Sequence, residues 1–304
     1  MLKHLRNRLI SSLLSLAALI VIVFFLSRLT GDPSALYLPL DASIESRENF
    51  REINGLNDPL IVQFSSFAKE IVQFDFGKSL RTSRPALEMV LEAFIWTLQL
   101  ALITIALVIL VATVIGSLAA FNVGGLFDRV ATVVSLIGAS APDFWIAIVG
   151  ILIFSIGFGW LPTSGTGSLL HWVLPVAILF IRPFGLITQV VRNSMIAALH
   201  APYTKTARAK GAGPRRIIFG HSLRNAALPI VTVMGDQAAG MLNGAVIVET
   251  IFGFPGVGKL MIDSILMRDF SVILASIVVT AIAILLMNIL IDLSYAALDP
   301  RTRA

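Results

Sequence analysis

The feature that most constrains this chain is a series of apolar runs, each about 20 residues or longer. An α-helix rises about 1.5 Å per residue, so about 20 apolar residues cross the roughly 30 Å hydrocarbon core of a bilayer. Because of these runs, 57% of the 304 residues are hydrophobic and only 13% are charged. We therefore predict an all-α integral membrane protein with six transmembrane helices. The predicted spans are residues 9–29, 94–121, 130–158, 172–191, 226–252 and 270–298.

The first apolar run follows Lys3, Arg6 and Arg8, a beginning that fits either a cleaved signal peptide or a membrane anchor. The run is longer than an ordinary signal core and lacks a small-x-small cleavage site at its end. We expect an uncleaved anchor. Residues 30–93 are polar and contain turn signals, so we expect an extramembrane region with short helices, for example at residues 60–72.

Lysine and arginine are concentrated on one side of this topology. They are prominent before the first span, in residues 192–225 between spans four and five, and in the tail, residues 299–304. Residues 30–93 carry charges of both signs, but long translocated loops largely escape the positive-inside rule. Residues 192–225 contain seven of them and no acid. With six spans all three segments lie on the same side, which the positive-inside rule identifies as the cytoplasm. Both termini are then cytoplasmic, residues 30–93 lie outside, and the net charge of +5 reflects topology rather than nucleic-acid binding.

Residues 192–225 predict a helix–turn–helix. Pro202 can open a helix, because its missing N–H would be unpaired there anyway. Gly211 and Gly213 can end that helix in the left-handed conformation, and Pro214 can open a second helix. The alternative is a basic loop that only enforces topology or contacts anionic lipid, and composition alone leaves both interpretations open.

Two stretches of this segment carry a specific pattern. Residues 203–213 read Tyr-Thr-Lys-Thr-Ala-Arg-Ala-Lys-Gly-Ala-Gly, and residues 221–229 read His-Ser-Leu-Arg-Asn-Ala-Ala-Leu-Pro. They resemble the cytoplasmic coupling loop of permeases from binding-protein-dependent ABC importers, in particular the dipeptide, oligopeptide and nickel branch. In the general family this loop begins Glu-Ala-Ala and has a glycine four residues after the last alanine. Here Lys-Thr-Ala at residues 205–207 and Gly211 hold those positions, and the lysine fits the peptide branch.

Four further stretches resemble the same branch, so the resemblance covers nearly the whole chain. They are residues 54–60, 75–80, 248–258 and 292–301. The resemblance implies the type I ABC importer permease fold (MetI-like) and an ATP-driven importer of di- or oligopeptides. The same branch also handles nickel chelates, opines and other small solutes, which remain alternatives.

The resemblance further implies partners in a bacterial inner membrane: a second permease subunit, two ATP-binding subunits and a periplasmic solute-binding protein. The coupling loop would dock as a short helix in a cleft of an ATP-binding subunit. Closure of two such subunits would drive the paired permeases from inward-facing to outward-facing. The coupling residues implied are Tyr203, Lys205, Thr206, Ala207, Arg208, Ala209, Lys210, Gly211, Ala212 and Gly213.

Residues 253–259, Gly-Phe-Pro-Gly-Val-Gly-Lys, match the first seven positions of the phosphate-binding pattern G-x-x-x-x-G-K-[ST]. However, Leu260 replaces the Ser or Thr that would bind magnesium, and the topology places the segment outside the cell. We expect a Gly/Pro turn before a short helix at residues 259–267. The chain has no cysteine and only four scattered histidines, so we expect no metal site, no cofactor and no enzymatic activity.

Ionisable side chains inside a span cost on the order of 2.5–3.5 kcal/mol and usually face protein or water. Asp143 and Arg182 fall at similar depth, and we expect them either to pair or to line a wet pathway; a purely structural ion pair is the alternative. Pro142 and Pro183 beside them can break their helices and expose carbonyls to a cavity. The side-chain amides of Asn243 and Asn288 are further polar candidates, which can instead join helices by hydrogen bonds. The candidate pathway residues are Asp143, Arg182, Asp236, Asn243, Glu249 and Asn288.

Other function classes are less compatible with the sequence. An ion-coupled secondary transporter would show broken helices in repeated halves, and we find no convincing internal repeat. An intramembrane enzyme would need a Ser/His, paired-Asp or His-Glu-x-x-His arrangement within the spans, and we find none in the sequence. The charges within the spans argue against a purely structural scaffold, which would not need them. We expect two parts: residues 1–93, the N-terminal helix with its periplasmic region, and residues 94–304, a five-helix permease core.

Overall fold

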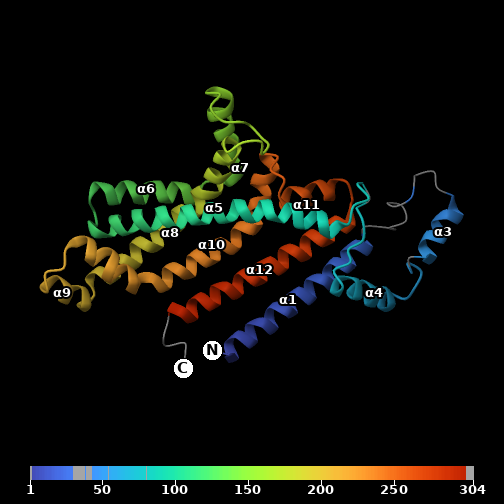
Figure 1. Ribbon diagram of the computed structural model, residues 1–304, viewed down its shortest axis with the longest axis horizontal. Coiled ribbons are helices and arrows are strands. Elements are labelled where there is room, and N and C mark those ends of the chain that lie inside the picture. Colours follow the sequence, from blue (N-terminus) through green and yellow to red (C-terminus); the bar gives the residue numbers. More distant parts are fainter. Residues whose placement is uncertain (1, 30–37, 39–42, 54, 80, 299–304) are drawn as a thin grey trace. The chain divides into compact units, whose positions relative to one another are not determined.

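The computed structural model describes residues 2–29, 38, 43–53, 55–79 and 81–298, and all regular elements in this part of the chain are helical (Figure 1). The α-helices are α1 (Leu2–Leu29), α3 (Ile44–Ile53), α4 (Leu60–Val72), α5 (Ala86–Phe121), α6 (Leu126–Ser140), α7 (Asp143–Gly150), α8 (Leu170–His200), α9 (Pro202–Ala209), α10 (Leu223–Ile251), α11 (Val257–Leu266) and α12 (Phe270–Leu298). Two π-helices extend them, η1 (Ile151–Gly157) after α7 and η2 (Arg216–Ser222) before α10.

Each of the six predicted spans corresponds to a helix or a pair of helices. Within the residues that the structure describes, four stretches are long and apolar enough to cross a membrane on their own: Ala86–Phe121, Leu170–His200, Arg216–Leu242 and Phe270–Ile291. The first predicted span lies within α1, in which the apolar stretch Leu13–Ile22 is described.

The third predicted span is bent rather than straight. Leu126–Ser140 and Asp143–Gly157 meet at 103°, as a broken span or a re-entrant loop. The bend lies at the expected interruption, because Pro142 disfavours the helical conformation at Ala141, which is extended (φ −79°, ψ 135°). The interruption at Pro142 is therefore confirmed, and it redirects the chain sharply.

The described chain forms two compact units. The first contains Ile95–Lys259 and Ile284–Ala304, and the second contains Leu2–Phe94 and Leu260–Ala283. The second unit thus joins the N-terminal region to a segment almost 200 positions later in the chain. A hydrogen bond across this separation contributes, because the hydroxyl of Ser79 donates to the Asp269 carboxylate at 2.5 Å.

In the first unit, α8 packs against both α6 and α10 (Figure 1). The contact with α6 is close because small residues lie at it. A Cβ on Gly185 would come within 2.2 Å of the carbonyl oxygen of Ser135, and a Cβ on Gly138 would be 3.1 Å from Ile181. Small residues at such positions let helix backbones approach, as is common between helices in membranes.

An aromatic cluster closes one end of the core of the first unit. Trp96 and Trp172 stack with ring centroids 5.9 Å apart, and Phe254 meets both edge-on, at 5.7 and 4.8 Å. Phe254 is fully buried, and the apolar core continues from it along α8 and α10. Edge-to-face pairs of this kind stabilise beyond their buried area by about 0.5–1.5 kcal/mol each.

In the second unit, aromatic side chains join α1 to α4. Phe24 is almost completely buried, and its ring lies 5.3 Å from that of Phe64 and 5.4 Å from that of Phe67. The spacing of Phe64 and Phe67 places both on one face of α4, since residues three apart are neighbours on a helix. The predicted short helix at residues 60–72 is confirmed as α4.

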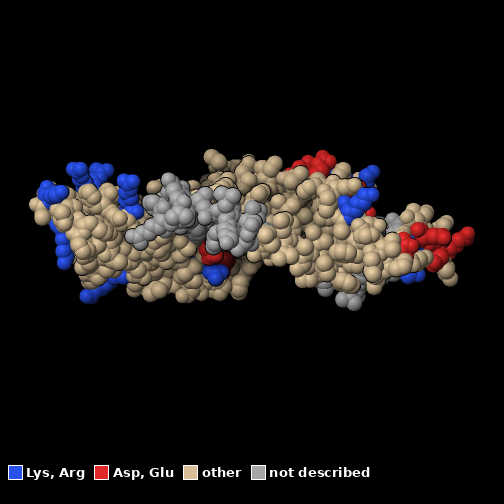
Figure 2. All heavy atoms as spheres, turned by 90° about the horizontal axis from the view of Figure 1, so that it is seen from below, with Lys and Arg blue, Asp and Glu red and all other residues tan. Residues whose placement is uncertain are grey.

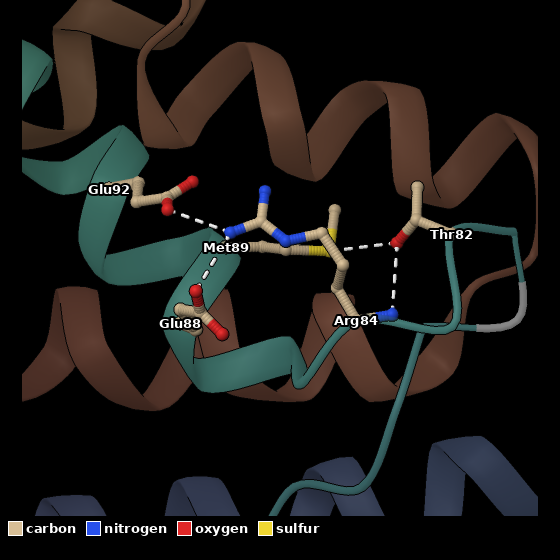
Figure 3. A network of polar contacts seen from close by, with 5 residues as sticks. All are labelled: Thr82, Arg84, Glu88, Met89 and Glu92. Carbon is tan, nitrogen blue, oxygen red and sulfur yellow. Dashed lines mark hydrogen bonds and ion pairs between the residues drawn. The ribbon is translucent and has the colours of Figure 1, made fainter.

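A polar network precedes and enters α5 in the same unit (Figure 3). One guanidinium nitrogen of Arg84 donates to Glu88 at 3.0 Å and to Glu92 at 2.7 Å, so the arginine lies between carboxylates one turn apart. The hydroxyl of Thr82 accepts from the Arg84 amide at 3.4 Å and lies 3.2 Å from the Met89 sulfur. These side chains are exposed, so the network orders the start of α5 locally and contributes little to stability.

Candidate functional site

The predicted coupling segment forms a short, exposed helix at the end of α8. Helix α9 follows α8 after a single residue, Ala201, and begins with Pro202 at its first turn, as predicted. Thr204 is its one buried side chain, and the Thr204 hydroxyl donates to the carbonyl of Ala198 at 2.8 Å. The other α9 side chains are exposed or half-buried. Helix α9 is therefore held at its base and open to a partner elsewhere.

Lysine and arginine surround this helix, and Figure 2 shows them gathered at the end where α9 lies. The exposed basic residues of this surface are Lys205, Arg208, Lys210, Arg215 and Arg216. The half-buried Ala207 gives the helix a point of close approach between these long side chains. A partner surface for α9 would have to combine a close fit at this alanine with negative charge around it.

Gly211 ends α9 in the left-handed conformation, with φ +83°. The Gly211 amide donates to the carbonyl of Arg208 at 2.9 Å, and the Ala212 amide donates to the carbonyl of Ala207 at 3.1 Å. This pair of bonds is the Schellman arrangement, which satisfies carbonyls left free at a helix end. Of the two glycines that could end α9 in the left-handed conformation, Gly211 adopts it and Gly213 does not, because one such residue already completes this closure.

The second predicted helix begins at Pro214, as expected, but continues as the π-helix η2 before α10. A π-helix inserts an extra residue per turn and is often found at functional positions. Ile217 and Ile218 of η2 are buried, so η2 packs against its neighbours, whereas α9 has a single buried side chain. No local sequence signal predicted the π-helix.

A buried ion pair joins the start of α6 to the α8 segment that leads to α9. The Arg192 guanidinium contacts both carboxylate oxygens of Asp128, with an Nη2–Oδ2 distance of 2.8 Å. The Gly124 amide also donates to Asp128 at 2.8 Å. The side chains of Asp128 and Arg192 are only 4% and 18% exposed. Such a bidentate pair fixes orientation as well as distance.

Removing one member of this pair should destabilise the first unit. For Asp128→Asn or Arg192→Gln we expect the free energy of unfolding to fall by about 1–3 kcal/mol, because the remaining group stays buried without its charged partner. Thermal unfolding in detergent measures the change. Arg84→Gln is the matched control, since it removes an exposed ion pair and should have little effect. Equal melting of all variants would contradict the prediction.

Four of the six candidate pathway residues line one cavity of about 430 Å³ in the first unit. Asp143 begins α7, Arg182 lies on α8, Asp236 on α10 and Asn288 on α12, so four helices converge there. The remaining lining residues are Leu179, Pro183, Gln237, Ala239, Gly240, Met241 and Ile284. The volume lies within the roughly 300–1,000 Å³ range of small-molecule sites.

Asp143 and Arg182 share this cavity without bonding to each other. The Oδ1 oxygen of Asp143 is buried and receives no hydrogen bond from any group the structure describes. Arg182 is exposed, and the described part of the chain holds no hydrogen bond or ion pair to it. Among the described residues, the carboxylate of Asp236 accepts a bond only from the neighbouring Gln237, at 3.3 Å. The cavity therefore contains charges of both signs with unused bonding capacity.

The two prolines expected beside this cavity behave differently. Pro142 breaks the helix, and α7 restarts at Asp143. Helix α8 instead continues through Pro183. Pro183 has no N–H to donate to the carbonyl of Leu179, four residues earlier, and both residues line the cavity. The carbonyl of one lining residue, Leu179, thus lacks its ordinary helical donor.

Glu249, the fifth candidate, lies elsewhere, near the end of α10, and is fully buried next to the start of α11. Its carboxylate accepts from the Thr97 hydroxyl at 2.6 Å and from the amides of Gly258 and Lys259 at 2.8 and 3.3 Å. The Thr97 oxygen accepts in turn from the Val257 amide at 2.9 Å. The phosphate-binding look-alike at residues 253–259 is thus a turn whose amides bind an internal carboxylate. The side chain of Asn243 lies outside the described residues.

Three residues of these sites were not predicted from the sequence. Gln237 lines the cavity, Thr97 binds Glu249, and Asp128 pairs with Arg192. A signal existed for Asp128, because an acid so close to a predicted span needs a partner. Thr97 and Gln237 are uncharged and carried no such signal.

The chain matches known proteins along its whole length. The family described as binding-protein-dependent transport system inner membrane component matches residues 112–304. A probable peptide ABC transporter permease of Sinorhizobium fredii is 37% identical, covering 99% of both chains. An oligopeptide transport system permease of Bacillus subtilis is 36% identical over 89% of each, and a glutathione transport system permease of Salmonella typhimurium is 35% identical over 100% of this chain and 99% of that one.

One solved structure, an amino acid ABC transporter with histidines, shares the fold. It is 17% identical with a TM-score of 0.53, and the match covers 69% of this chain and 94% of that chain. This likeness confirms the predicted permease architecture for the matched part. Together with the family match over residues 112–304, it bears out the resemblance drawn from the coupling segment. The chain belongs to the inner-membrane components of binding-protein-dependent transport systems.

Proposed function

We propose that this chain is a permease subunit of an ABC importer for short peptides, and that α9 is the contact with its ATP-binding subunit. The solute class is supported by the relatives, whose names refer to peptides, oligopeptides and glutathione. Nickel chelates, opines and other small solutes are the alternatives within the same transport role. The complex would contain a second permease, two ATP-binding subunits and a periplasmic solute-binding protein.

The observation that carries the coupling proposal is the construction of α8 and α9. Helix α8 is continuous over 31 residues, and a single residue separates it from α9. Arg182 of α8 lines the cavity, so one rigid element runs from the cavity to the exposed helix. A displacement of α9 would move α8 directly, and closure of two ATP-binding subunits would bias the cavity between two states.

The proposed orientation in the membrane rests on charge. The basic residues around α9 and near both ends of the chain favour the cytoplasmic side of a bacterial inner membrane for these segments. Residues 1–93 then form the anchor and a periplasmic region, and residues 94–304 form the permease core. In this orientation α9 faces the compartment that contains ATP. The binding protein would deliver the solute from the opposite side.

The test is co-purification with the ATP-binding subunit. Ala207→Leu and Gly211→Leu should each reduce the amount of that subunit at least about tenfold, because a bulky side chain blocks close approach to α9. Gly159→Leu is the matched control. Gly159 is also left-handed (φ +65°, against +83° for Gly211), and nothing lies within 4 Å of a Cβ at either position.

Retained co-purification in both α9 variants would contradict the docking proposal. The transport class is tested separately with the complete complex in proteoliposomes, by uptake of labelled trialanine in the presence of its binding protein. ATP inside the vesicles should be required. Uptake driven by an ion gradient without ATP would instead identify a secondary transporter.

A further inference from the structure

The cavity described above has charges that the coupling proposal does not use. Asp143, Arg182 and Asp236 line its wall, and each comes from a different helix. Charged groups in a span are costly, and here they have not been neutralised by bonding to one another. A ligand with complementary charges would supply the missing partners.

The acceptor side of the cavity is formed by Asp143 and the backbone. The Asp143 Oδ1 oxygen is buried, with no donor among the described residues. A buried carboxylate oxygen without a hydrogen bond is unfavourable until a donor reaches it. Leu179, whose carbonyl lacks its helical donor because of Pro183, is among the residues that line the same cavity. An ammonium group has three donors and could satisfy both acceptors.

The donor side of the cavity is Arg182. Its guanidinium is accessible and has no hydrogen bond or ion pair within the part of the chain that the structure describes. A planar guanidinium binds a carboxylate through two parallel hydrogen bonds, which a lysine at the same place could not do. Asn288 and Gln237 add uncharged polar groups that can bind peptide amides.

We propose that this cavity binds a short peptide as a zwitterion, with its terminal ammonium at Asp143 and the Leu179 carbonyl and its terminal carboxylate at Arg182. This inference rests on the proposed transport function and adds a solute site within the permease itself. Both free termini are then recognised inside the membrane, independently of the binding protein. The permease becomes a second filter for solutes with two free ends.

Binding is measured on the purified complete complex without its binding protein, by equilibrium dialysis. The probes are labelled trialanine, N-acetyl-trialanine and trialanine amide. The unmodified complex should bind each blocked peptide about tenfold or more weakly than trialanine, since each block removes one charge-assisted contact. Equal affinity for all three probes, or no binding of trialanine, would overturn the proposal.

The variants assign each terminus to its residue. Arg182→Gln should bind trialanine and its amide equally and still discriminate against the acetylated peptide, whereas Asp143→Asn should show the reverse. Arg182→Lys, which keeps the charge, should retain part of the preference for a free carboxylate. Arg129→Gln is the control, because this exposed arginine does not line the cavity. Loss of both preferences in either single variant would overturn the assignment.

Failure of this proposal can be told apart from failure of the proposed function. If the unmodified complex contains the ATP-binding subunit and takes up trialanine with ATP, but binds the free and the blocked peptides with equal affinity in dialysis, only the cavity site is wrong. If no ATP-binding subunit co-purifies and ATP does not drive uptake, the transport function itself is wrong. The amount of ATP-binding subunit is measured in every variant preparation, so a variant that has not assembled is recognised. In that case the binding of the three peptides to the unmodified complex decides whether the cavity site is correct.

Discussion

Gly185→Ala is expected to force α8 away from α6 and to lower the free energy of unfolding by about 3 kcal/mol or more. The added Cβ would lie 2.2 Å from the carbonyl oxygen of Ser135 and 2.9 Å from the amide nitrogen of Ala139. Both atoms belong to the α6 backbone, so neither can rotate away as a side chain would. The two helices must separate, and the packing around the contact is lost.

Thermal unfolding in detergent measures this loss. Gly240→Ala is the matched control, because Gly240 also lies inside a long helix but has nothing within 4 Å of a Cβ. There alanine should be neutral or stabilising by up to about 1 kcal/mol, from its better helix propensity. Should Gly185→Ala melt like the unmodified protein, the close approach of α6 and α8 would be refuted.

Glu249→Ala is expected to have an effect of similar size, by a different route. It removes the acceptor of the Thr97 hydroxyl and of the amides of Gly258 and Lys259, at a fully buried position. Each buried donor left without a partner costs about 1–3 kcal/mol, so the total should reach about 3 kcal/mol or more. The start of α11 should loosen first, because its amides depend on this carboxylate.

Glu249→Gln should recover much of the stability. The amide oxygen can accept from Gly258 and Lys259, and the amide NH₂ can donate to the Thr97 oxygen. The measurement is again thermal unfolding, combined with hydrogen exchange at residues 257–266. Glu92→Ala, which removes an exposed carboxylate, should change neither. If the alanine and glutamine variants behave alike, hydrogen bonding is not the role of Glu249.

Local features of the chain were predictable because their causes are local. The apolar runs became helices, Pro142 broke the third of them, and Pro202 and Gly211 bounded α9. In each case the residue itself carries the reason: a missing N–H, a conformation open to glycine, or a length that matches the bilayer. The choice between Gly211 and Gly213 was not predictable, because both glycines offer the same local freedom and only the hydrogen bonds of the folded turn select Gly211.

Hydropathy and motif order, which are read along the chain, were enough to predict the helical membrane class, the positions of the helices and the family. They could not predict that Asp143, Arg182, Asp236 and Asn288 meet in one cavity while Glu249 lies apart from it, because this depends on the folded arrangement. Which side chains converge depends on how far each helix is rotated and how closely it packs. Those quantities are set by contacts between distant residues, such as Gly185 against Ser135, and no single stretch of sequence contains them.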